Sequence, residues 1–193
     1  MKRICVFCGS RTGDRALYSA AAQRLGSLLS ARAIGLVYGG GRIGLMGLIA
    51  DAVLAGGGEA IGVIPDFLAG PEVAHSGLSE LRVVGTMHER KAMMADLADG
   101  FIGLPGGYGT FEEFFEILTW AQLGLHAKPC ALLNIAGYFD PLLAAVNHAL
   151  EEGFVRTRHR GLIIDDADPE RLLERMARYV PPTEQPVLHP DQI

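Results

Sequence analysis

The sequence contains few cysteines and no long apolar run. Three cysteines stand among its 193 residues, and the first apolar run, residues 4–8, ends after five residues. That length is too short for the core of a signal peptide, and no other window approaches a membrane span. We therefore expect no membrane segment and a reducing, cytoplasmic setting.

Positive charge is also scarce. Lys and Arg number 17 against 22 Asp and Glu, so the net charge is −5. This balance argues against a general nucleic-acid binder, and a phosphate-bearing ligand would need a local positive site instead. The only lysines are Lys2, Lys91 and Lys128, which disfavours a Schiff-base mechanism.

Patterns typical of metal sites and covalent catalysis are missing as well. The six histidines are scattered, without the second histidine of an H-E-x-x-H site, and no G-x-S-x-G elbow is present. Cys5 and Cys8 form a C-x-x-C pair. If they lie on a strand they point to opposite faces, so we expect buried structural thiols. We expect neither a metal nor a cofactor.

Glycine, in contrast, is abundant and clustered. The chain has 25 glycines, about 13% against a typical ~7%, and they gather at 39–41, 56–58 and 106–109. Short apolar runs without polar alternation are separated by helical patterns, which predicts a doubly wound α/β parallel sheet with helices on both faces. We expect one domain over residues 1–180 and a loosely held tail over 181–193. Strands are predicted at residues 3–8, 36–38, 60–64, 81–84, 101–104, 131–134 and 162–164. Helices are predicted over residues 14–33 and 110–123. A further helix is expected to end near residue 55, and three others to begin at residues 86, 140 and 168.

The chain is organised around residues 104–113, where an apolar run leads into a glycine loop and then a helix. Gly106, Gly107 and Gly109 leave backbone N–H groups uncovered at the positive end of that helix. Such an arrangement suits a phosphate or carboxylate. The alternative is a simple capping box, Thr110-x-x-Glu113, with a tight turn before it. The glycine density favours the anion site.

A second glycine loop, Gly39-x-Gly41-x-x-Gly44, formally matches the dinucleotide fingerprint. It closes the second strand–helix unit rather than the first, and Asp66 lies too far along the chain for the ribose acid. An NAD-dependent enzyme is therefore disfavoured.

Arg90 and Lys91 follow a capping box, Thr86-x-x-Glu89, which places them in the opening turns of a helix. By spacing alone, a solvated helix face is the favoured interpretation of this pair. Both glycine loops, the Glu72 loop and the Arg90 helix all follow strand ends, so we expect them to share one edge of the sheet. An amide cradle with nearby cations and carboxylates fits a nucleoside monophosphate better than a dinucleotide.

Four motifs then occur together: residues 39–47, 87–94, 105–113 (a PGGxGTxxE pattern) and 118–129. In this order they resemble the LOG (Lonely Guy) family, the cytokinin riboside 5′-monophosphate phosphoribohydrolases, over residues 6–154. The resemblance implies a Rossmann-like fold, a homodimer, and hydrolysis of N6-substituted AMP, or AMP itself, to free base and ribose 5-phosphate. Although members were long labelled lysine decarboxylases, nothing in the chain supports that label.

The resemblance also implies roles for particular residues. Arg90 and Glu113 match the family's catalytic pair. The other matching positions are substrate contacts: Glu72, Lys91, Gly106, Gly107, Tyr108, Gly109, Thr110, Glu112 and Thr119. A competing hypothesis from another class is a nucleotide- or cofactor-binding carrier of the same fold, without turnover.

Overall fold

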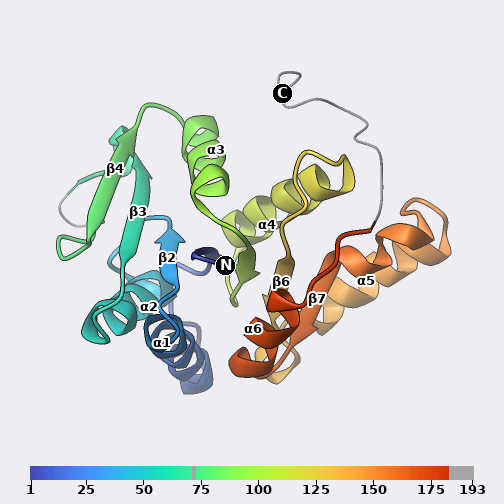
Figure 1. Cartoon of the computed structure of the whole chain (residues 1–193), viewed down its shortest axis with the longest axis horizontal. Coiled ribbons are helices and arrows are strands. Elements are labelled where there is room, and N and C mark those ends of the chain that lie inside the picture. Colours follow the sequence, from blue (N-terminus) through green and yellow to red (C-terminus); the bar gives the residue numbers. More distant parts are fainter. Residues whose placement is uncertain (71–72, 183–193) are drawn as a thin grey trace.

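A seven-stranded parallel sheet runs through the chain in the order β4-β3-β2-β1-β5-β6-β7 (Figure 1). The structure, a computed structural model, describes residues 1–70 and 73–182. The strands are β1 Arg3–Phe7, β2 Gly35–Tyr38, β3 Ala60–Pro65, β4 Glu80–Val84, β5 Phe101–Gly103, β6 Cys130–Leu133 and β7 Ile163–Asp166. The helices are α1 Ala16–Ala31, α2 Gly44–Ala55, α3 Met87–Leu97, α4 Tyr108–Gln122, α5 Asp140–Glu151 and α6 Pro169–Ala177.

The helices cover both faces of the sheet, as predicted for a doubly wound α/β fold. Side chains of α1, α2 and α6 pack on one face, and those of α3, α4 and α5 on the other. Alternation along β1 sends Val6 to the first face and Cys5 to the second, while Cys8 joins the first. The two cysteines of the C-x-x-C pair therefore lie in different layers. All three cysteines are buried and free.

The strand order reverses beside β1. The chain moves outward from β1 to β4 and then returns to the other side of β1 to form β5. In open α/β sheets, ligands bind at such a switch point, beyond the carboxyl ends of the strands. The sheet therefore directs attention to the loops that follow β1 and β5.

The expectation that no strand shows polar alternation is wrong for β4. Among the strands of residues 1–70 and 73–182, this one pairs only with β3, so it forms an edge of the sheet. Leu81 and Val83 are exposed on it, while Arg82 bonds Glu80 at 2.8 Å. An edge strand contacts fewer neighbours than a central one, and charges along it oppose pairing with another sheet.

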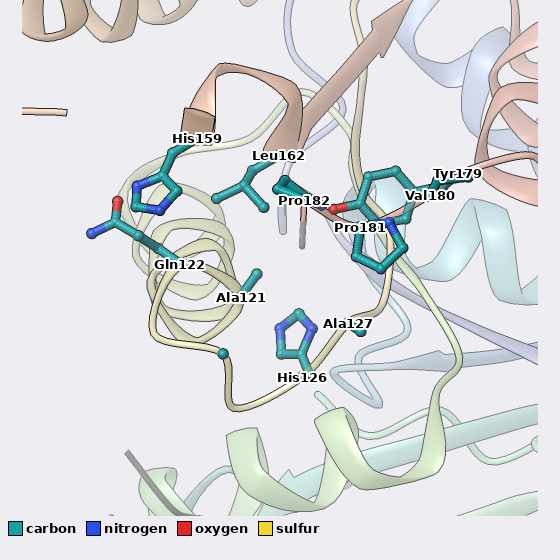
Figure 2. A pocket seen from close by; sticks show the side chains of 11 residues that line it. Ala121, Gln122, His126, Ala127, His159, Leu162, Tyr179, Val180, Pro181 and Pro182 are labelled. Atoms are coloured by element: carbon teal, nitrogen blue, oxygen red, sulfur yellow. The ribbon is translucent and has the colours of Figure 1, made fainter. Parts of the chain in front are cut away.

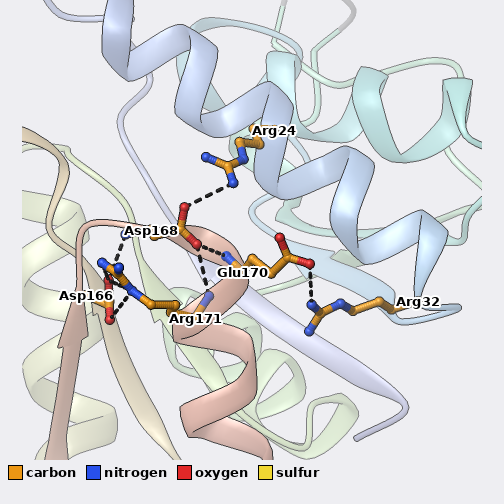
Figure 3. Close-up of polar contacts among 6 residues, drawn as sticks. All are labelled: Arg24, Arg32, Asp166, Asp168, Glu170 and Arg171. Atoms are coloured by element: carbon orange, nitrogen blue, oxygen red, sulfur yellow. Dashed lines mark hydrogen bonds and ion pairs between the residues drawn. The ribbon is translucent and has the colours of Figure 1, made fainter.

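The beginning and end of the fold are connected by ion pairs (Figure 3). Arg24 of α1 lies 3.0 Å from Asp168, and Arg32 lies 3.1 Å from Glu170. Asp168 also accepts hydrogen bonds from the amides of Glu170 and Arg171, which confirms the helix start predicted there. Within residues 1–70 and 73–182, no helix combines the length and apolar character needed to cross a bilayer.

Candidate active site

A cavity of about 470 Å³ lies where the sheet reverses its order. It is bounded by the segments that follow β1, β2, β3 and β5, together with the first turns of α3 and α4. The expected shared edge is thus confirmed for both glycine loops and the Arg90 helix. Glu72 lies outside the described residues; its neighbour Val73 lines the cavity. The lining residues are Cys8, Gly9, Ser10, Gly39, Gly41, Ile43, Met46, Ile64, Pro65, Leu68, Val73, Met87, Arg90, Gly107, Tyr108, Gly109, Thr110 and Glu113.

The start of α4 forms one wall of this cavity. The helix begins at Tyr108, and no described side chain caps it. The capping-box interpretation of Thr110 and Glu113 is therefore wrong, because both residues lie inside the helix rather than at its boundary. A Cβ at Gly107 or Gly109 would meet no described heavy atom within 4 Å. Their backbones consequently face open space, which leaves the helix start accessible to an anion.

Gly106 is required for a different reason. A Cβ at this position would overlap the Thr110 Oγ1 atom and lie 2.9 Å from the Gly9 amide nitrogen. Its carbonyl accepts a hydrogen bond from the hydroxyl of Tyr138. Tyr138 follows β6, and its role was missed in the sequence because no motif connects that segment to the glycine loop.

Arg90 and Glu113 form a buried ion pair facing the cavity. The Nη1 atom of Arg90 donates to Oε1 of Glu113, and the two side chains are 9% and 12% exposed. Nε of Arg90 donates to the Val63 carbonyl oxygen at 3.0 Å. A Cβ at Gly39 would overlap Nη2 of Arg90, so this glycine makes room for the guanidinium. Arg90 is therefore fixed by β3, α4 and the second glycine loop at once.

The interpretation of Arg90 and Lys91 as a solvated face is wrong. The Thr86–Glu89 capping box is present as predicted, but both basic residues are only 8% exposed. Sequence spacing places them correctly on α3; it cannot show that α4 and β3 cover them.

Burial governs the proton affinity of Glu113. Loss of water around the carboxyl raises its pKa above the ordinary value, and the charge and hydrogen bond of Arg90 oppose this. Glu113 therefore holds a proton more readily than a surface glutamate. Perturbed carboxyl groups in clefts are typical of acid–base or electrostatic chemistry.

The predicted substrate contacts divide into two groups. Gly107, Tyr108, Gly109 and Thr110 line the cavity together with Arg90 and Glu113. Gly106 is outside this lining, and so are three side chains: Lys91, Glu112 and Thr119.

These three residues lie on α3 and α4. Lys91 Nζ bonds Glu112 and also lies 2.9 Å from Glu116, while the Thr119 hydroxyl donates to the Phe115 carbonyl of its own helix. Their role as substrate contacts stays a prediction.

A separate cavity of about 440 Å³ lies beyond the end of α4. Figure 2 shows His126, His159 and Tyr179 around it, and none of the predicted site residues is in its lining. In the described part of the chain, no cluster of three or more His, Cys, Asp or Glu side chains is placed to hold a metal ion. Of the charged residues predicted from sequence, Arg90 and Glu113 thus lie together in the first cavity.

Comparison with known proteins identifies the relatives of this chain. A family model described as "Possible lysine decarboxylase" matches residues 46–176. A probable cytokinin riboside 5′-monophosphate phosphoribohydrolase from rice, LOGL9, is 53% identical over 93% of this chain and 79% of its own length. The enzyme LOG1 from Arabidopsis thaliana is 51% identical over 93% of this chain and 84% of its own.

Solved structures share the fold at much lower identity. The molybdenum cofactor binding protein from Rippkaea orientalis is 20% identical, with a TM-score of 0.70 over 92% of this chain and 97% of that one. With curated relatives identical at about half of the aligned positions over nearly its whole length, the chain belongs to the LOG (Lonely Guy) family.

Proposed function

We propose that the chain hydrolyses the N-glycosidic bond of N6-substituted AMP, or of AMP itself, and releases free base and ribose 5-phosphate. The observation that carries this proposal is the buried Arg90–Glu113 pair in the same cavity as the uncapped start of α4. Amides suited to a phosphate and a charged pair suited to the sugar therefore lie in one cavity. The names of the relatives agree with this reaction. None of the three lysines lines the cavity, which gives a lysine-based decarboxylation no support.

The 5′-phosphate is bound by the amides of Gly107 to Thr110. Breaking the bond between ribose and base builds positive charge on the sugar and leaves the bonding electron pair on the base, which takes up the proton that the attacking water loses. The Glu113 carboxylate stabilises that charge and orients or deprotonates the attacking water, as carboxylates do in glycoside hydrolysis. Arg90 remains charged throughout, so it stabilises negative charge and holds Glu113 in place.

The remaining wall of the cavity is apolar. Ile43, Met46, Leu68, Val73 and Met87 line it. This surface suits a purine ring and an apolar group on its N6 atom, because ligand pockets bind such groups through hydrophobic contact. Comparing the kinetics of AMP and isopentenyl-AMP measures how much that wall contributes.

Replacing Glu113 by Gln tests the reaction. We expect Glu113→Gln to lower the rate of base release from AMP and isopentenyl-AMP by ~10²–10³, because the stabilising negative charge is lost. Free base is quantified by chromatography, and circular dichroism confirms the fold. Glu174→Gln, on an exposed residue of α6, is the matched control. Full activity of Glu113→Gln would remove this residue from the mechanism.

A carrier without turnover remains the second candidate, because molybdenum-cofactor binding and carrier proteins share the fold. A carrier would use the amide cradle but would not need an arginine–carboxylate pair. Free base from wild-type protein incubated with AMP would exclude it. Binding of AMP without any base release would support it.

We also propose that the protein is a homodimer in which α3 and α4 face the second copy. Glu112 and Thr119 are exposed on α4 outside the cavity of their own chain and face the substrate of the partner, while the buried Lys91 pairs with Glu112. A groove of about 780 Å³ between the two helices is lined by Trp120 and Glu116, among others. The cytoplasmic location stays a prediction, in agreement with three free buried thiols.

A charge placed on this face tests the dimer. Phe115 is 37% exposed on α4, and we expect Phe115→Glu to give a monomer, because an interface does not accept an unpaired buried charge. The mass is measured by light scattering after size exclusion. Phe154, 87% exposed after α5, provides the control Phe154→Glu, which keeps the dimer. A dimeric Phe115→Glu variant would contradict the assignment of this face.

A further inference from the structure

The cavity contains less positive charge than a phosphate monoester requires. Among its described lining residues, Arg90 is the only Lys or Arg, and its guanidinium is paired with Glu113. A phosphate monoester carries about −1.5 to −2 charges at pH 7, whereas a helix start supplies roughly +0.5. A further cation is therefore needed beside the amide cradle.

The segment after β1 is fixed next to that cradle. The Gly9 amide donates to the Pro105 carbonyl at 3.0 Å, and the Gly9 carbonyl accepts from the Leu45 amide at 3.0 Å. Gly44 has a φ of +62°, and a Cβ there would overlap the Ser10 carbonyl carbon. The backbone at residues 9–10 is thus held between the starts of α2 and α4.

Two side chains of this segment are free to bind a ligand. Ser10 lines the active-site cavity, and it also lines an adjoining cavity of about 240 Å³. The two cavities share Gly9, Ser10 and Gly107, and Arg11 lines the adjoining one. Neither the Ser10 hydroxyl nor the Arg11 guanidinium bonds another described residue, and both residues are exposed.

We propose that Ser10 and Arg11 complete the phosphate site, an inference that rests on the proposed hydrolysis of nucleoside monophosphates. The Ser10 hydroxyl donates to one phosphate oxygen. Arg11 extends over the backbone of Gly9 and Gly107 and binds two phosphate oxygens, the geometry that a guanidinium favours. Its guanidinium supplies positive charge to the phosphate, whereas the guanidinium of Arg90 is already paired with Glu113. Both are phosphate-binding residues and take no part in breaking the glycosidic bond.

The test compares ligands with and without a phosphate group. We expect Arg11→Ala to raise the KM for AMP, and the inhibition constant of ribose 5-phosphate, by roughly tenfold or more, the range for a lost hydrogen bond to a charged group. Ser10→Ala raises both by a smaller factor. The kcat for AMP and the inhibition constant of adenosine, which has no phosphate, stay at wild-type values. Arg11→Lys restores part of the loss, because it returns the charge without the two-point geometry.

Arg15 provides the matched control. It belongs to the same connection, stacks on the Tyr18 ring and lines neither cavity, so Arg15→Ala keeps the wild-type KM. Unchanged constants for AMP and ribose 5-phosphate in both Arg11→Ala and Ser10→Ala would overturn the inference.

Failure of the proposed function would look different. Wild-type protein would then release no base, while calorimetry with ribose 5-phosphate would still report phosphate binding. Loss of that binding in Arg11→Ala supports the assignment of Arg11 even without turnover, and its retention refutes it.

Discussion

Glu113 experiences two opposing effects. Burial favours the neutral acid, while Arg90 favours the carboxylate, and burial is the larger of the two. Since the folded pKa is raised, the contribution of this group to stability is present below its unfolded pKa and is lost as the pH rises through the folded pKa. Keeping Glu113 charged at neutral pH therefore costs the fold some stability.

The pKa of Glu113 can be measured directly. In a carbon-13 NMR titration of the side-chain carboxyl groups, we expect its midpoint to lie above the ordinary glutamate value of ~4.3, because the carboxyl is desolvated. The spectrum of Glu113→Gln identifies the signal by its absence, and exposed Glu174 provides an internal reference. A midpoint at or below the reference would mean that Arg90 outweighs burial.

At the scale of residues, sequence motifs identified which residues form the site but did not show which contacts those residues make. The PGGxGTxxE motif and the Arg90–Lys91 pair were found by type and spacing, and most of these residues line one cavity. The capping-box interpretation of Glu113 was wrong because the same two residue types serve either a helix end or a buried pair. The contacts of Arg90 with Val63 and Gly39 decide between those uses, and they come from segments far away in the chain.

A side-chain cap is present at two of the six described α-helix starts and is absent from those of α1, α2, α4 and α5. Thr86 caps α3 and Asp168 caps α6, both as predicted from their side chains. No described side chain caps α4, which begins at Tyr108. A cap would occupy the amides that the proposed phosphate requires.

Gly109 allows stability and function to be separated. Gly109→Ala places a methyl group in open space inside α4, so we expect the free energy of unfolding to rise by about 0.5 kcal/mol from helix propensity. The KM for AMP rises as well, because the methyl group obstructs the approach of phosphate to the amides. Thermal unfolding and steady-state kinetics measure the two effects.

Gly161→Ala is the control for this substitution. Gly161 also has no described neighbour within 4 Å of its Cβ position, but it lies outside both α4 and the cavity, so its KM stays unchanged. An unaltered KM in Gly109→Ala would show that phosphate does not approach this part of the helix.

At the scale of the whole molecule, the alternation of short apolar runs with helical patterns was enough to predict the doubly wound sheet. It could not predict which strand lies at an edge, since that depends on the order of the strands rather than on any one of them. The ion pairs between α1 and α6 could not be predicted from the sequence either, because Arg24 and Asp168 are far apart along the chain.

The ion pairs between α1 and the start of α6 predict that the fold loses stability in acid. The pKa of Asp168 is lowered, first by the Arg171 amide and also by the Arg24 charge, so its stabilising contribution is present above its unfolded pKa and is lost as the pH falls through the folded pKa. We expect the thermal midpoint to fall in Asp168→Asn, which keeps the cap but loses the charge, and to fall further in Asp168→Ala. The difference in thermal midpoint between Asp168→Asn and the wild-type protein becomes smaller at high salt and at low pH. A midpoint that is insensitive to both substitutions would remove Asp168 from the connection between the first and last helices.

Trp120 is the single tryptophan of the chain and lies in the groove between α3 and α4. The molecule consequently carries one tryptophan fluorophore, on the face proposed to meet a second copy. Its emission wavelength reports how much water reaches that face, so progressive dilution of unlabelled protein would follow dissociation of the proposed dimer without any added dye.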